Sequence, residues 1–76
     1  MDNYRLNVVT ILEQFQILYQ NNRIQNEKND LVKLTKLGLS DWSAKIELGK
    51  RISMLLEKEP DEFFQKIYEK ILQQIN

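Results

Sequence analysis

The residues of this chain that could carry out acid–base chemistry are two pairs of carboxylates around a proline. Glu57 and Glu59 precede Pro60, and Asp61 and Glu62 follow it. General acid–base catalysis requires a carboxyl group whose pKa is shifted by burial or by a neighbouring charge. Carboxylates that flank a helix boundary are usually capping or solvated groups, and the chain contains no histidine to tune them. We therefore interpret these four residues as structural.

Other kinds of catalytic and cofactor site are excluded by the residue types present. The chain has no cysteine and no histidine, so the commonest metal ligand, the thiol nucleophile and the commonest general base are missing. Its two glycines, Gly38 and Gly49, belong to no glycine-rich phosphate-binding pattern. The sequence therefore predicts a protein that is not an enzyme and that uses no metal or other cofactor.

One arrangement has the layout of a DNA-reading helix-turn-helix. A short helix over residues 30–37 is followed by a glycine-containing turn and by a longer helix that begins near Asp41. The carboxylates of Asp41 and Glu47 on the would-be recognition helix argue against contact with phosphates. The basic residues that could still contact a phosphate backbone are Arg23, Lys28, Lys33 and Lys36.

The elements that position all of these residues are predicted to be helices. Apolar residues recur at spacings of three and four, glycine occurs twice and proline once, and no hairpin signal is present. At 76 residues the chain has room for one helical domain over residues 1–76 with a small hydrophobic core. We predict an all-α fold, a small bundle of four helices at about residues 3–21, 30–37, 40–58 and 60–75.

Local signals set the expected helix boundaries. Asp30 is expected to cap the second helix and Ser40 the third, while Pro60 is expected at the first position of the fourth. Gly38 is expected to end the second helix in the left-handed conformation. The fourth helix then presents one continuous apolar face, which begins at Phe63.

The third helix is expected to be the central one. Its wide apolar arc includes Trp42 and Ile46, whereas Met54 is left for solvent. Gly49 costs up to about 1 kcal/mol relative to alanine in a helix interior. A close helix crossing over Gly49 and Ser53 would explain that glycine, and we expect one there.

The first helix carries apolar residues on two sides. Opposite its main apolar face lie Leu6, Val9 and Ile17. In a four-helix monomer such a second stripe indicates either a helix buried on all sides or a contact with another protein. We take these three residues as interface candidates, with Trp42 and Met54 as secondary ones. Trp42, the only tryptophan, is nevertheless expected mainly in the core.

Composition indicates the broad class of protein. The 11 basic and 11 acidic residues leave a net charge of zero, without the basic excess typical of nucleic-acid binders. No apolar run reaches the roughly 18 residues that span a membrane, and the N-terminus lacks a signal-peptide pattern. We expect a cytoplasmic protein without membrane association, and the many Lys, Asn, Ile and Gln residues indicate an A+T-rich, bacterial genome.

These features together predict a class of function. We predict a small helical protein–protein interaction module that forms a homodimer or serves as an accessory subunit of another protein. The alternative is a helix-turn-helix-like regulator that binds nucleic acid.

Overall fold

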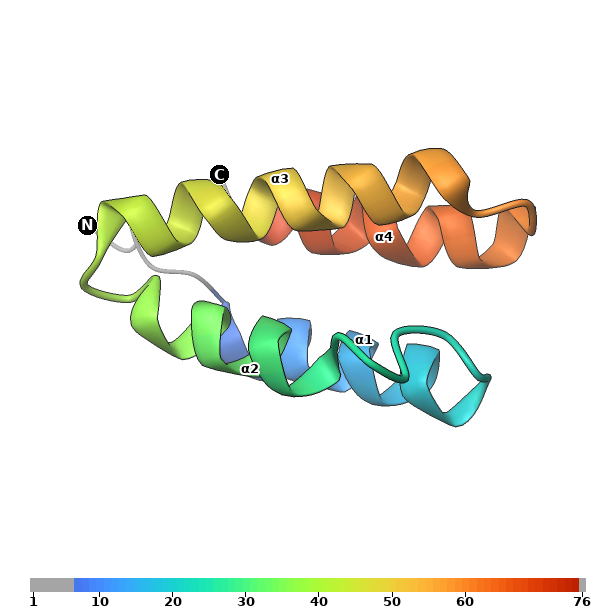
Figure 1. Cartoon of the computed structure of the whole chain (residues 1–76), viewed down its shortest axis with the longest axis horizontal. Helices are drawn as coiled ribbons and strands as arrows, with labels where there is room; N and C mark the ends of the chain where they lie inside the picture. Colours follow the sequence, from blue (N-terminus) through green and yellow to red (C-terminus); the bar gives the residue numbers. More distant parts are fainter. Residues whose placement is uncertain (1–6, 76) are drawn as a thin grey trace.

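The computed structural model describes residues 7–75 as a bundle of helices without strands (Figure 1). This confirms the predicted all-α class and the four-helix bundle. The helices are α1 (Val8–Gln20), α2 (Lys28–Leu37), α3 (Trp42–Lys58) and α4 (Glu62–Ile75).

The helices are arranged as two hairpins that lie against each other. Figure 1 shows α1 and α2 on one side of the bundle and α3 and α4 on the other. Helix α1 packs closely against α2 and α4, and α3 against α2 and α4, so each helix has two neighbours and one diagonal helix whose backbone lies farther away. No helix among residues 7–75 is therefore central.

The core lies along the bundle axis and receives one stripe of side chains from each helix. Phe15 and Tyr68 are its largest fully buried side chains, and each stripe follows the spacing of three and four expected of an amphipathic helix. Burial of this apolar surface provides most of the stabilisation, at about 25 cal/mol per Å². The other fully buried apolar side chains are Ile11, Leu18, Leu31, Leu48, Ile52 and Ile71.

Helix α1 begins later than the sequence predicts. Asn7 has a non-helical backbone, with φ −79° and ψ 80°, and its side chain accepts a hydrogen bond of 3.2 Å from the Thr10 N–H. Asn7 is thus an N-cap, so the helix begins directly after it, although the apolar periodicity alone would extend the helix further toward the N-terminus. The predicted helix from residue 3 is therefore wrong at Asn7, which is not helical. The residues before Asn7, including Leu6, lie outside the described part of the chain.

The α2–α3 junction is where predicted but is built differently. Helix α2 starts at Lys28, so Asp30 lies in its first turn instead of capping it. Gly38 has φ −64°, not a left-handed conformation, because the chain continues in a right-handed turn in which the Asp41 N–H donates to the Leu37 carbonyl at 2.9 Å. Asp41, not Ser40, caps α3 by accepting the Ser43 N–H at 2.9 Å.

Helix α4 also starts slightly later than predicted. Its first residue is Glu62, not Pro60. The Asp61 side chain accepts the Phe63 N–H at 2.8 Å, so an Asp cap sets the boundary. Phe63 was expected on the buried face but is 62% exposed, and its ring stacks edge-on against Phe64 at 5.1 Å.

The wide apolar arc of α3 is only partly buried. Its buried stripe is Ala44, Leu48 and Ile52, whereas Trp42 is 67% exposed and Ile46 is also exposed. The prediction of Trp42 and Ile46 as core residues is therefore wrong. A helix with two neighbours buries one stripe, and the rest of a wide arc must face outward.

Gly49 crosses no other helix within the chain. A Cβ atom added at this position would meet no heavy atom within 4 Å. The expected close helix crossing over Gly49 and Ser53 is thus wrong for the monomer. The helix carries the conformational cost of a glycine without any packing gain inside the chain.

Gly49→Ala should therefore stabilise the monomer. We expect a gain of about 0.5–1 kcal/mol, because alanine restricts the unfolded chain and meets no neighbour in the folded one. This corresponds to a rise in Tm of roughly 4–8 °C per kcal/mol for a domain of this size. Thermal unfolding of dilute protein followed by circular dichroism measures it, with Lys50→Ala as a control that should change little. A lower Tm would mean that Gly49 has a contact within the chain.

Candidate functional site

Exposed apolar side chains gather at the end of α2 and the beginning of α3. Leu37, Leu39, Trp42 and Ile46 are all exposed, and we call them the α2–α3 surface. Leu39 and Trp42 line one depression, and Trp42 and Ile46 line the next. A contiguous exposed apolar patch on a small protein indicates a binding surface more often than scattered apolar residues do.

The α2–α3 surface continues into a shallow groove between α3 and α4. Its two adjoining depressions, of about 660 and 320 Å³, share Gly49 and Ile75. The groove is open at Gly49 because this residue has no side chain to fill the space beside α4. We call it the α3–α4 groove, and its apolar or small lining residues are Trp42, Ile46, Gly49, Ser53, Met54, Leu72 and Ile75.

Trp42 is the largest member of both features. It is the first residue of α3, directly after the capping Asp41, so no preceding helical turn covers its ring. The ammonium group of Lys45 lies 5.2 Å from the ring centroid, a cation–π contact that orients the indole. The ring is therefore held at the rim of the groove rather than in the core.

The interface candidates on α1 lie apart from this surface. Val9 is 68% exposed and Ile17 is 36% exposed, so α1 is not buried on all sides. Two helical turns separate them, and the exposed side chain of Glu13 stands between. Leu6 lies outside the described residues. Within the described residues, Val9 and Ile17 are thus separated by a charged side chain and are not joined in one apolar patch.

Met54 lies in a different position from Trp42. It is exposed, as predicted, and lines both the far end of the α3–α4 groove and a depression beside Glu27 and Arg51 of the α2–α3 interface. Met54 is therefore at the edge of the candidate surface.

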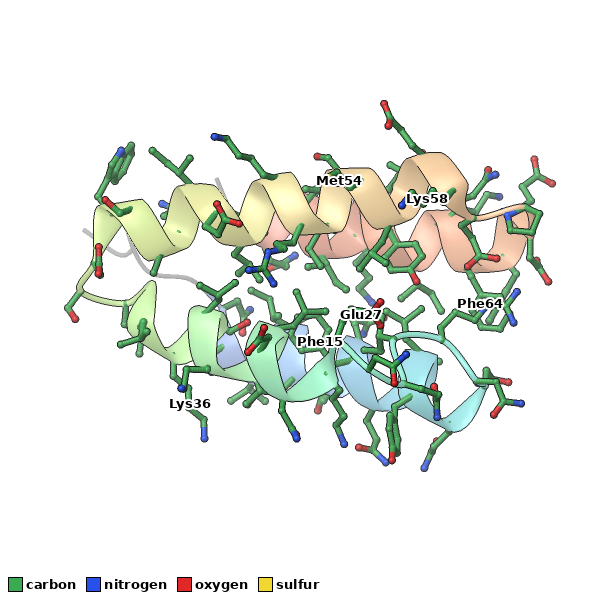
Figure 2. The ribbon with its side chains drawn as sticks, viewed as in Figure 1. Phe15, Glu27, Lys36, Met54, Lys58 and Phe64 are labelled. Carbon is green, nitrogen blue, oxygen red and sulfur yellow. The ribbon has the colours of Figure 1, made fainter. Side chains whose placement is uncertain are left out.

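The four basic residues of the nucleic-acid alternative are not brought together as free cations. Arg23 is bound to Glu59 at 2.8 Å, and Lys28 donates to the Gln16 side chain at 3.2 Å and lies over the Tyr19 ring. Lys33 and Lys36 are exposed on α2, and Figure 2 shows Lys36 extending away from α3 and α4. Two of the four positive charges are thus already engaged within the chain.

Arg23 and Glu59 form a bidentate ion pair at the loop end of the bundle. The guanidinium donates from Nε to Oε1 at 3.1 Å and from Nη2 to Oε2 at 2.8 Å. Its Cζ atom lies 4.1 Å from the centroid of the Phe64 ring, which Figure 2 labels at the loop end of α4. Oε2 also accepts the Asp61 N–H at 3.1 Å, so the buried carboxylate is held from two sides.

Sequence reasoning missed this pair. Glu59 was interpreted as a carboxylate at a helix boundary, and Arg23 as a candidate phosphate contact. The two residues are 36 positions apart in the chain, so no helical periodicity links them. The missing signal is the topology, which brings the α1–α2 loop and the α3–α4 loop to the same end of the bundle (Figure 1).

The ionisation of this cluster favours a structural role. The hydrogen bonds from Arg23 lower the pKa of Glu59 although burial opposes them, and the Asp61 N–H adds to the lowering. Burial raises the pKa of Tyr68, which lines the same loop end, to about 12. Near neutral pH the carboxylate is charged and the phenol is protonated, so neither group is poised to exchange a proton during catalysis.

Residues 7–75 contain no group of three or more potential acidic, histidine or cysteine metal ligands, and none of the helices within that range has the length and apolar character to cross a membrane. No protein-family model, curated protein or solved structure matches this chain. The α2–α3 surface with the α3–α4 groove is thus the candidate site that the residues themselves define.

The pH dependence of stability should report on Glu59. Because its folded pKa is lowered, the pair contributes fully above the unfolded value of about 4.3, and the contribution is lost as pH falls through the folded pKa. We expect Glu59→Gln to be less stable than wild type at pH 6, with a difference that shrinks between pH 5 and pH 3. Urea unfolding at a series of pH values measures this difference.

Glu57→Gln is the matched control for Glu59→Gln. Glu57 is an exposed carboxylate two residues earlier, so its substitution should leave the profile parallel to that of wild type. A constant difference between Glu59→Gln and wild type over this pH range would contradict a stabilising ion pair.

Proposed function

We propose that this protein is a non-catalytic interaction module that self-associates through the α2–α3 surface. The observation that carries the proposal is that Leu39, Trp42 and Ile46 line adjoining depressions at one end of the bundle, with exposed Leu37 at the end of α2. Aromatic and aliphatic side chains in such a patch favour removal from water. The activity is binding, driven by apolar docking.

A second copy of the chain is the favoured partner because of size and charge. A domain this small gains much of its possible burial by dimerisation, and closed dimers are the commonest assembly of soluble proteins. The net charge is zero, so two copies do not repel each other overall. The groove beside Trp42 further offers each copy both a protruding ring and a recess.

The proposed dimer is weak. Helix α3 has 17 residues and is about 25 Å long, and only one strip of it is apolar and exposed. A contact of that length falls among interfaces below about 1,200 Å², which are typical of transient complexes. We therefore expect a dissociation constant in the micromolar range, about −8 kcal/mol.

Nucleic-acid binding receives less support from the same structure. Arg23 and Lys28 are engaged within the chain, and the N-terminus of α3 presents the carboxylate of Asp41. The remaining exposed cations on α2, Lys33 and Lys36, provide too little charge for a phosphate footprint. This alternative predicts salt-sensitive DNA binding that Lys33→Glu with Lys36→Glu would weaken.

Light scattering over a concentration series tests self-association. We expect the mass to rise from one chain to two across the micromolar range and the fluorescence of Trp42, the only tryptophan, to shift to shorter wavelength as its ring leaves water. Trp42→Ala should raise the dissociation constant about 30-fold, since truncation of a hot-spot residue, a class enriched in tryptophan, costs about 2 kcal/mol or more.

Phe63→Ala is the matched control. Phe63 is as exposed as Trp42 but lies at the start of α4, at the other end of the bundle, so its loss should leave dimerisation unchanged. A constant monomer mass up to millimolar concentration would overturn the proposed function. Equal weakening by both substitutions would remove the α2–α3 surface as the site.

A further inference from the structure

Helix α3 has an outward stripe whose spacing resembles that of a helix–helix contact. Trp42, Ile46, Gly49 and Ser53 follow one another at intervals of four, three and four residues, and we call them the α3 seam. Such intervals place side chains on one face of a helix. The seam is uncharged and lies outside the buried stripe of α3, and Trp42, Ile46 and Ser53 within it are exposed.

The sizes of the seam residues are complementary about its midpoint. Trp42 and Ser53 lie equally far from the point between Glu47 and Leu48, and so do Ile46 and Gly49. Each large residue is thus matched by a small one. Two copies of the seam laid antiparallel about that midpoint would place large side chains over small ones throughout.

We propose that two copies of this protein pack α3 against α3 in this antiparallel register. Trp42 lies over Ser53 of the second copy, and Ile46 lies over Gly49 of the second copy. This inference rests on the proposed self-association and adds the geometry of the contact. Each copy contributes the same residues, as a two-fold symmetric interface requires.

The open space at Gly49 supports this register. Apart from the two residues next to Gly49 and the nearby backbone of α3 itself, no atom lies within 4 Å of a Cβ built there, so the space can receive Ile46 of the second copy. Beyond Gly49, the groove is lined by Ser53 of α3 and Leu72 of α4, where an incoming indole finds apolar surface. Small residues at these positions allow the two helix backbones to approach closely.

Charge also fits the antiparallel arrangement. Helices α3 and α4 run antiparallel, and Gly49 and Leu72 line the same groove, so Glu69 lies near the level of Ser53. Ser53 is the position that receives Trp42 of the second copy, and Lys45 follows Trp42 by one helical turn. The register therefore brings Lys45 of one copy beside the turn of α4 that carries Glu69 of the other. None of the ion pairs among residues 7–75 involves Lys45 or Glu69.

A charge exchange tests the placement of Lys45 and Glu69. We expect Lys45→Glu to weaken the dimer about two- to fivefold, as does Glu69→Lys, and the double substitution to bind more tightly than either single one. Lys50→Glu with Glu69→Lys is the control, because Lys50 lies on the other side of the seam and should give no restoration. Additive weakening by Lys45→Glu and Glu69→Lys would overturn this contact.

Single cysteines test the register itself, since the chain has no cysteine of its own. In the proposed register, residue 49 of one copy and residue 49 of the other are about 4.5 Å apart along the helix axis, so closely packed helices allow a disulfide between them. The two copies of residue 53 are about 16 Å apart along the axis, which is too far for a disulfide. We expect Gly49→Cys to form a covalent dimer under a mild oxidant and Ser53→Cys to remain monomeric on a non-reducing gel.

Other crosslinking results would separate an error in the register from an error in the proposed self-association. Crosslinking of Ser53→Cys as readily as Gly49→Cys would indicate parallel helices and overturn the register. Failure of Gly49→Cys to crosslink, while wild-type protein is dimeric by light scattering, would place the interface elsewhere and leave the proposed function intact. Absence of a wild-type dimer would overturn both.

Discussion

The bidentate pair between Arg23 and Glu59 joins the two hairpins at the end of the bundle opposite the α2–α3 turn. The two hairpins are joined covalently only through the turn between α2 and α3. At the opposite end the pair connects the α1–α2 loop to the α3–α4 loop, with Phe64 beneath the guanidinium. Loss of either partner would leave a charged group without its counterpart at a packed junction, which is more destabilising than loss of an exposed ion pair.

The loop that carries Arg23 is held in an unusual conformation to make this contact. Ile24 has φ 52°, a region that β-branched residues seldom occupy, yet its side chain is buried. Asn22, with φ 64°, tolerates the same region more easily. Burial of Ile24 and the hydrogen bonds of Arg23 together offset the local strain. The loop end is thus specialised for stability, while the α2–α3 end is left apolar and open.

The sequence predicted the helices well because helix formation depends on local spacing. The observed helix boundaries differ from the predicted ones by a few residues, because the side chains of Asn7, Asp41 and Asp61 accept the capping hydrogen bonds. Contacts between residues that are far apart in the sequence could not be predicted in the same way. Nothing in the spacing of the residues couples Arg23 to Glu59, and the exposure of Trp42 follows from the number of helices around α3, which periodicity does not reveal.

The wide apolar arc of α3 is best understood as two stripes with different partners. Ala44, Leu48 and Ile52 face the core, and a neighbouring stripe from Trp42 to Ser53 faces outward. A monomer alone gives no reason for an exposed tryptophan, nor for a glycine that weakens the helix while contacting nothing. A helix packed against the outer stripe would account for both, because it would cover the ring and use the gap. The exposed tryptophan and the unpacked glycine, which a single chain does not explain, are then residues expected at a contact between two chains.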